Sequence, residues 1–176
     1  MSLAPPLRYL AGYPAHLVAQ VSDCLADGSL GERLRRKYPL PHAVRNDGAL
    51  YAYVGELKAR HLRNAAPLSK VVWDGKLQRV HNALGIHARV ARVQGGQLRT
   101  RREIRIANLF REAPPEFLRM IVVHELAHLK EAEHDKAFYQ LCCRMEPDYH
   151  QLEFDVRTWL CLVEATGAAL WAPSTP

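Results

Sequence analysis

The residues with the clearest chemical potential lie in the run HELAHLKEAEH, from His124 to His134. On an α-helix, residues four positions apart lie on the same face, so His124 and His128 can direct their imidazoles to one point. Glu125 would lie beside a metal ion held there without binding it. His134 follows six residues after His128, far enough for the chain to leave the helix and return a third nitrogen. Three histidines and an open fourth position predict a catalytic zinc site, because structural zinc sites are closed by four protein ligands.

The same residues predict hydrolysis. Zinc in this site would lower the pKa of a bound water toward ~7, and Glu125 would remove its proton as general base. The alternative is a buried helix without a metal. Residues 117–129 are mostly apolar, which indicates a helix that is buried all round. Unpartnered histidine and glutamate side chains there would cost several kcal/mol, so a bound metal is favoured.

The elements around this motif predict an α+β fold. Apolar positions three and four residues apart predict helices at 16–25, 30–38, 49–63, 115–130, 135–145 and 149–165. Runs rich in β-branched residues predict strands at 70–73, 88–94 and 98–107, with a turn at Gly95-Gly96 and a short helix at 78–84. We expect a small antiparallel sheet packed on the helix that carries the motif. Residues 1–66 would form an N-terminal helical extension and residues 67–170 the catalytic domain.

Several single residues mark the ends of these elements. Asp47 and Asp135 are candidates to cap the helices that follow them, and Gly167 to end the last helix. The tail from Trp171 to Pro176 is predicted to be loose.

The composition fits one folded domain in the cytoplasm. The chain has 176 residues, of which 48% are apolar, enough to form a core. No run of 18 apolar residues occurs, which argues against a membrane span, and the first residues lack the apolar stretch of a signal peptide. The four cysteines form no CxxC pair and are typical of small buried side chains.

Charge is distributed unevenly along the chain. Residues 1–110 carry 18 Lys and Arg against 7 Asp and Glu, whereas residues 111–176 carry 6 against 11. The basic half suggests an anionic partner, nucleic acid among them. The alternative is that these cations are the solvated faces of helices and strands.

The motif block resembles a known family. The runs IVVHELAHL at Ile121–Leu129, HDKAF at His134–Phe138 and PDY at Pro147–Tyr149 are similar to the YgjP-like zinc metallopeptidases. These are compact zincins related to the SprT-like and WLM proteases, and the resemblance covers roughly residues 70–165. The spacing is also that of the metzincins, but no glycine occurs in the linker at 130–133.

The resemblance implies a zincin-like fold and hydrolysis of peptide bonds. It implies that His124, His128 and His134 bind Zn²⁺ and that Glu125 is catalytic. Tyr149 is the oxyanion stabiliser that the resemblance favours. From its position alone, Tyr149 could equally be a packing residue, and His150 is the alternative candidate for the role.

Three further hypotheses remain open. Glu153 or Asp155 could orient a ligand imidazole, with Glu153 preferred. The substrate, a protein or peptide, could pair with the strand around Ile104–Ile106. Rival functions are a SprT-like protease held on nucleic acid by Arg33–Lys37 and Arg99–Arg105, a hydrolase of small non-peptide molecules, and a catalytically silent zinc-bound binding module.

Overall fold

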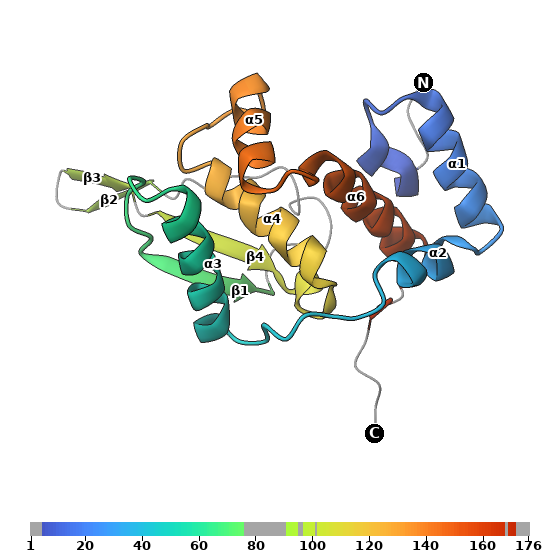
Figure 1. Ribbon diagram of the computed structural model, residues 1–176, viewed down its shortest axis with the longest axis horizontal. Helices are drawn as coiled ribbons and strands as arrows, with labels where there is room; N and C mark the ends of the chain where they lie inside the picture. Colours follow the sequence, from blue (N-terminus) through green and yellow to red (C-terminus); the bar gives the residue numbers. More distant parts are fainter. Residues whose placement is uncertain (1–4, 76–90, 95–96, 101, 168, 172–176) are drawn as a thin grey trace. The chain divides into compact units, whose positions relative to one another are not determined.

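The computed structural model describes residues 5–75, 91–94, 97–100, 102–167 and 169–171 (Figure 1). Its elements are η1 (Pro5–Leu10), α1 (Ala15–Ala26), α2 (Leu30–Lys37), α3 (Asp47–His61), β1 (Lys70–Asp74), β2 (Ala91–Gln94), β3 (Gln97–Thr100), β4 (Glu103–Ala107), η2 (Asn108–Glu112), α4 (Pro115–Ala127), α5 (Lys136–Met145) and α6 (Tyr149–Thr166). The fold mixes helices with small sheets, as predicted. The short helix predicted at 78–84 lies outside the described residues.

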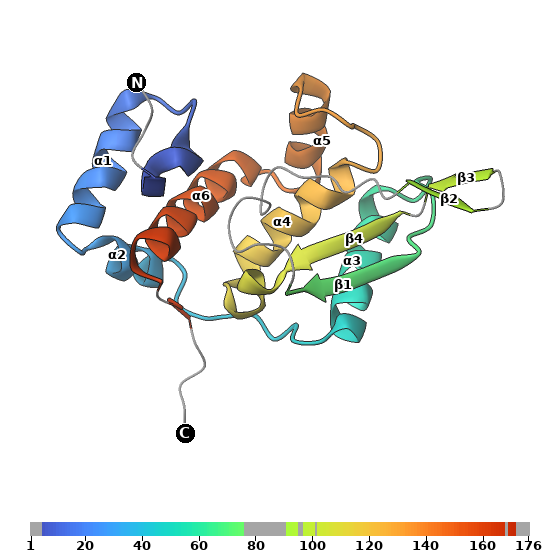
Figure 2. The ribbon, with the colours of Figure 1, turned by 180° about the vertical axis from the view of Figure 1, so that it is seen from behind.

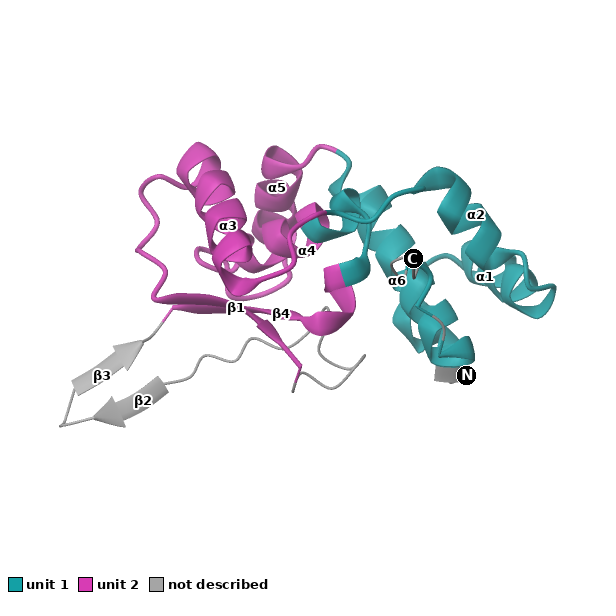
Figure 3. Ribbon diagram, turned by 90° about the horizontal axis from the view of Figure 1, so that it is seen from below, with its two compact units in different colours: residues 1–42, 112–118, 148–176 teal, residues 43–111, 119–147 magenta. Residues whose placement is uncertain are grey.

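The chain forms two compact units that interleave along the sequence (Figure 3). Unit 1 comprises residues 1–42, 112–118 and 148–176, and unit 2 comprises residues 43–111 and 119–147. The domain boundary predicted between residues 66 and 67 stays a prediction.

The main sheet differs from the predicted one. Figure 2 shows β1 and β4 side by side, and they pair in parallel from Lys70 opposite Glu103 to Asp74 opposite Ala107. The prediction of an antiparallel sheet on the motif helix is therefore wrong. The run 98–107, predicted to be one strand, contains parts of two, β3 and β4. β3 pairs antiparallel with β2, as a hairpin predicts, whereas β4 pairs with a strand far earlier in the chain. Parallel pairing needs a long crossover, which local sequence patterns do not reveal.

In unit 2, helices cover one side of the β1–β4 sheet. Figure 3 shows α3 and α5 on the same side of β1 and β4. Alternate strand residues are buried, as a half-buried strand requires. Asn46, not Asp47, caps α3, since its side chain accepts a hydrogen bond from the Ala49 N–H at 2.8 Å. Asp47 instead accepts from the Trp73 N–H at 2.9 Å and so joins the start of α3 to β1.

In unit 1, α6 packs with η1, α1 and α2. Within its core, Phe117 lies 4.8 Å from Tyr38 and 5.5 Å from both Trp159 and Trp171 between ring centroids. Trp171 is only 5% exposed and donates a hydrogen bond to the Tyr38 carbonyl at 2.6 Å. The prediction of a loose tail is therefore wrong at Trp171. Gly167 ends α6 with a φ of 68°, as predicted.

None of the helices in the described part of the chain is both long enough and apolar enough to cross a membrane. The cytoplasmic location stays a prediction.

Candidate metal centre

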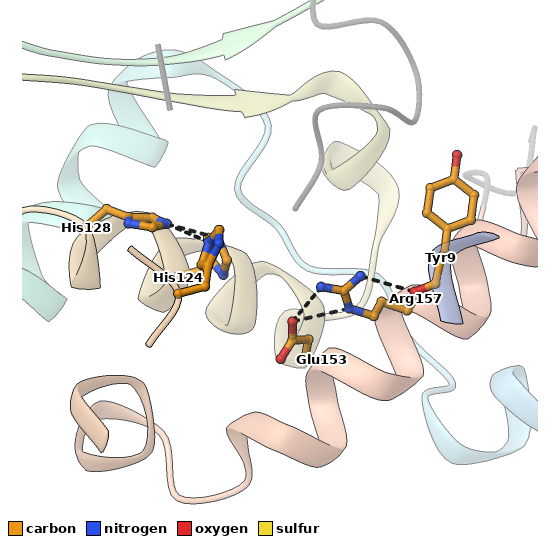
Figure 4. Close-up of polar contacts among 6 residues, drawn as sticks. Tyr9, His124, His128, Glu153 and Arg157 are labelled. Atoms are coloured by element: carbon orange, nitrogen blue, oxygen red, sulfur yellow. Dashed lines mark hydrogen bonds and ion pairs between the residues drawn. The ribbon is translucent and has the colours of Figure 1, made fainter. Parts of the chain in front are cut away.

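The three predicted histidines meet in unit 2. Their Nε2 atoms lie 3.3 Å apart between His124 and His128, 3.0 Å between His128 and His134, and 3.2 Å between His134 and His124. Figure 4 shows the ring of His128 directed at that of His124. His124 is buried, His128 is partly buried and His134 is exposed, so the cluster extends from the interior to the surface. The structure thus confirms that the motif brings the three imidazoles together.

This arrangement fits a metal ion better than a set of hydrogen bonds. Four ligands at tetrahedral angles and a Zn–N distance of about 2.05 Å would hold neighbouring nitrogens about 3.3 Å apart. The distances found here, 3.0–3.3 Å, are close to that value. Nδ1 of His128 lies 2.8 Å from the Glu131 carbonyl oxygen. Because a carbonyl only accepts, Nδ1 carries the proton, and Nε2 therefore has the lone pair that a cation would bind.

The end of α4 positions the first two histidines. His124 lies in the last turn of α4, and the backbone N–H of His128 donates to the His124 carbonyl at 3.4 Å, which extends the helical path by one residue. The backbone N–H groups of Leu129, Lys130 and Glu131 then donate to carbonyls of Leu126 and Ala127. This tight turn brings the Glu131 carbonyl to His128 and reverses the chain toward the third histidine.

The start of α5 positions the third histidine. Asp135 caps this helix, as predicted, with its side chain accepting from the Phe138 N–H at 3.0 Å. His134 directly precedes this cap residue, so the cap fixes the backbone position from which the His134 side chain extends. The fully buried Phe138 ring lies against all three imidazoles, with centroid distances of 5.0 Å to His124, 4.4 Å to His128 and 4.8 Å to His134. Its apolar surface excludes water from one side of the cluster.

Two contacts hold these elements to the rest of unit 2. Arg119 on α4 forms an ion pair with the buried Glu146, the residue that follows α5. Arg102, just before β4, donates to the Leu129 carbonyl at 3.3 Å. These contacts connect α4 to the C-terminal end of α5 and the segment after α4 to the start of β4.

Glu125 is partly buried in the last turn of α4. Burial raises the pKa of its carboxyl group to about 8, because the charged form loses solvation. A cation in the histidine cluster would favour the charged form and lower that pKa. The carboxylate is then suited to accept a proton near neutral pH.

Other predicted site residues lie in unit 1. Tyr149 is fully buried at the first residue of α6, His150 is exposed, and the role of each stays a prediction. Glu153 accepts from Arg157 at 2.8 and 3.2 Å, and Arg157 also donates to the Tyr9 carbonyl at 3.1 Å (Figure 4).

Asp155 is likewise engaged within unit 1. It accepts hydrogen bonds from Lys37 at 2.6 Å, from Tyr38 at 2.5 Å and from Gln151 at 3.0 Å. These contacts give Glu153 and Asp155 a structural part in unit 1. Whether either residue orients a ligand imidazole stays a prediction. In the structure the Glu131 carbonyl orients the His128 ring, and sequence analysis missed this contact because a backbone acceptor is not visible in residue type.

The chain matches one protein family and is similar to a curated protein. A family model described as YgjP-like, metallopeptidase domain, matches residues 48–158, more than half of the chain. A protein of Escherichia coli (strain K12) named UTP pyrophosphatase is 57% identical over 154 residues, which cover 88% of this chain and 92% of that protein. No solved structure matches the chain. The family match and this relative both support a hydrolase.

Proposed function

This chain belongs to the YgjP-like metallopeptidase family, and we propose that it is a zinc-dependent hydrolase that cleaves UTP to UMP and pyrophosphate. The choice of UTP as substrate rests on the 57% identity to the protein named UTP pyrophosphatase, over 92% of that protein's length. The histidine cluster supports the metal, since three imidazoles and an open position suit catalytic zinc. The excess of Lys and Arg in residues 1–110 also suits an anionic substrate.

Each site residue has a part in this reaction. His124, His128 and His134 would hold the metal ion through Nε2, and the Glu131 carbonyl would keep the His128 ring in the binding tautomer. When bound, the ion would acidify water and neutralise phosphate oxygens. The Glu125 carboxylate would take one proton from the attacking water. The water oxygen would then bond to the α-phosphorus as the bond to the bridging oxygen breaks, and pyrophosphate would leave with that electron pair.

Tyr149 is our candidate for a donor to the charge that develops on the phosphate. The family resemblance supports this role, and the ring itself is fully buried at the start of α6, in unit 1. Replacing Tyr149 with Phe keeps the ring and removes only the hydroxyl. A fall in kcat with an unchanged melting temperature would support the role, and an unchanged kcat would exclude it.

The test of the proposed function is UTP hydrolysis by the zinc-loaded protein, with UMP and pyrophosphate measured by chromatography. We expect Glu125→Gln to lower kcat by about 10²- to 10⁴-fold while zinc remains bound, because only the proton acceptor is lost. His128→Ala should remove both zinc and activity. Exposed His16 lies outside the cluster, so His16→Ala is the matched control. Equal UTP hydrolysis by the wild type and Glu125→Gln would contradict the proposal.

Peptide-bond hydrolysis is the second candidate, favoured by the HExxH spacing and by the family's metallopeptidase description. The same zinc and the same Glu125 would act on a carbonyl in place of a phosphorus. An unfolded protein offered to the same variants distinguishes the two substrates. Turnover of the protein but not of UTP would select the peptidase, and turnover of neither with zinc bound would select the silent binding module. Association with nucleic acid through the basic half stays a prediction.

A further inference from the structure

Unit 2 also contains a cavity on α3, away from the histidine cluster. A cavity of about 360 Å³ lies along α3 and is lined by Tyr51, Gly55, Lys58, Ala59, Arg63 and residues 67–68. We call this cavity the α3 pocket. Its volume is within the range of pockets for small molecules. None of its lining residues belongs to the metal centre.

The floor of the α3 pocket is open because two of its residues are small. Tyr51, Gly55 and Ala59 follow one another at intervals of four along α3 and so share a helix face. A Cβ atom added at Gly55 would meet no heavy atom within 4 Å. A flat group could therefore approach the helix backbone between Tyr51 and the C-terminal end of α3.

The ring of Tyr51 lies at the end of the pocket floor that is nearer the N-terminus of α3. Tyr51 is 53% exposed, one of two large hydrophobic side chains so exposed in the described part of the chain. Such a ring gains little from packing in the fold. Its free face can stack a flat partner, and stacking of a nucleic-acid base on an aromatic side chain is tolerant of base identity.

Two cationic side chains, Lys58 and Arg63, lie toward the other end of the floor. Lys58 donates to the Ala65 carbonyl at 2.9 Å, and Arg63 donates through Nε to the Ala59 carbonyl at 3.1 Å. These bonds hold both side chains at the pocket and leave further N–H donors on each. Among the described residues no acidic side chain lines the pocket, and the nearby Glu56 pairs with Arg60 at 3.1 Å. The pocket is therefore suited to an anion.

We propose that the α3 pocket binds a nucleoside phosphate, with the base against Tyr51 and the phosphate at Lys58 and Arg63. Tyr51 and Lys58 are separated by about 10 Å along the helix axis at 1.5 Å per residue, a span suited to a ligand with a ring at one end and an anion at the other. The choice of a nucleotide over another aromatic anion rests on the proposed function. The anion site itself is inferred only from the residues that line the pocket.

The experiment is calorimetric titration of UMP, and separately of pyrophosphate, into zinc-free protein. UMP is chosen because it cannot be turned over as UTP would be, and zinc is removed so that the metal centre does not bind the phosphate. We expect Tyr51→Ala to weaken UMP binding at least about fivefold, and Tyr51→Phe to leave it nearly unchanged, because stacking needs the ring and not the hydroxyl. The double variant Lys58→Ala/Arg63→Ala should weaken both ligands at least about tenfold. The matched control is Arg60→Ala, which removes a cation from α3 that does not line the pocket.

The outcomes separate this inference from the proposed function. UMP binding that depends on Tyr51, Lys58 and Arg63 but not on Arg60 supports the inference, even if the zinc-loaded protein fails to hydrolyse UTP. UMP binding that is equal in all variants overturns it, even if UTP is hydrolysed. Binding of pyrophosphate alone, or of neither ligand, also overturns it.

Discussion

At the scale of single residues, the metal centre depends on proton positions as much as on distances. Three Nε2 atoms lie within 3.0–3.3 Å of one another, and each needs its lone pair to bind a cation. The Glu131 carbonyl meets this need for His128, because it takes the Nδ1 proton. Residue type and spacing were enough to predict that His124, His128 and His134 converge. They were not enough to predict the backbone acceptor, because every residue has a carbonyl.

The raised pKa of Glu125 gives a prediction for the zinc-free protein. The native state holds a proton on Glu125 up to about pH 8, whereas the unfolded chain loses it near 4.5. Between these values the unfolded chain binds fewer protons, so the free energy of unfolding should fall as the pH rises. Urea unfolding of zinc-free wild type and Glu125→Gln, from pH 5 to 8, measures this. We expect the wild type to lose stability relative to the variant, and parallel curves would contradict the assignment.

At the scale of elements, helix ends position the ligands. His124 and His128 depend on the end of α4, and His134 depends on the start of α5, where Asp135 accepts from the Phe138 N–H. This cap was predictable, since an Asp before an apolar helix is a local signal. The pairing of β1 with β4 was not predictable, because partners far apart in sequence leave no local signal.

The cap of α5 can be tested against the cap of α3. Asp135→Ala should cost about 1 kcal/mol of stability through loss of the cap and should also weaken zinc binding, because His134 loses its fixed position. Asn46→Ala removes the cap of α3, which carries no ligand. It should cost a similar free energy and leave zinc affinity unchanged. Zinc competition titrations and urea unfolding give both quantities. Equal zinc affinity in the two variants would show that the cap does not position His134.

At the scale of the whole molecule, segments far apart in sequence build each unit. In unit 1, Trp171 joins Phe117, Tyr38 and Trp159 in one aromatic core. The sequence analysis predicts a loose tail from Trp171 to Pro176. Its burial depends on partners more than 10 residues away, and tertiary packing of this kind cannot be predicted from a local pattern.

Trp171→Ala should therefore destabilise the protein by about 3 kcal/mol, because the change leaves a large cavity in the core of unit 1. The matched control is Leu40→Ala, since Leu40 belongs to the same unit and is 70% exposed. That change should alter stability by about 0.5 kcal/mol or less. Urea unfolding measures both. A similar small effect for the two variants would show that Trp171 contributes little to the core.

The proposed function requires one metal ion bound at His124, His128 and His134. Native mass spectrometry of the purified protein tests this requirement most directly, with His134→Ala as the variant and His16→Ala as the control. We predict about one zinc ion per chain in the wild type and in His16→Ala, and its loss in His134→Ala. Zinc that remains fully bound in His134→Ala, or a wild type that binds no metal when zinc is supplied, would contradict it.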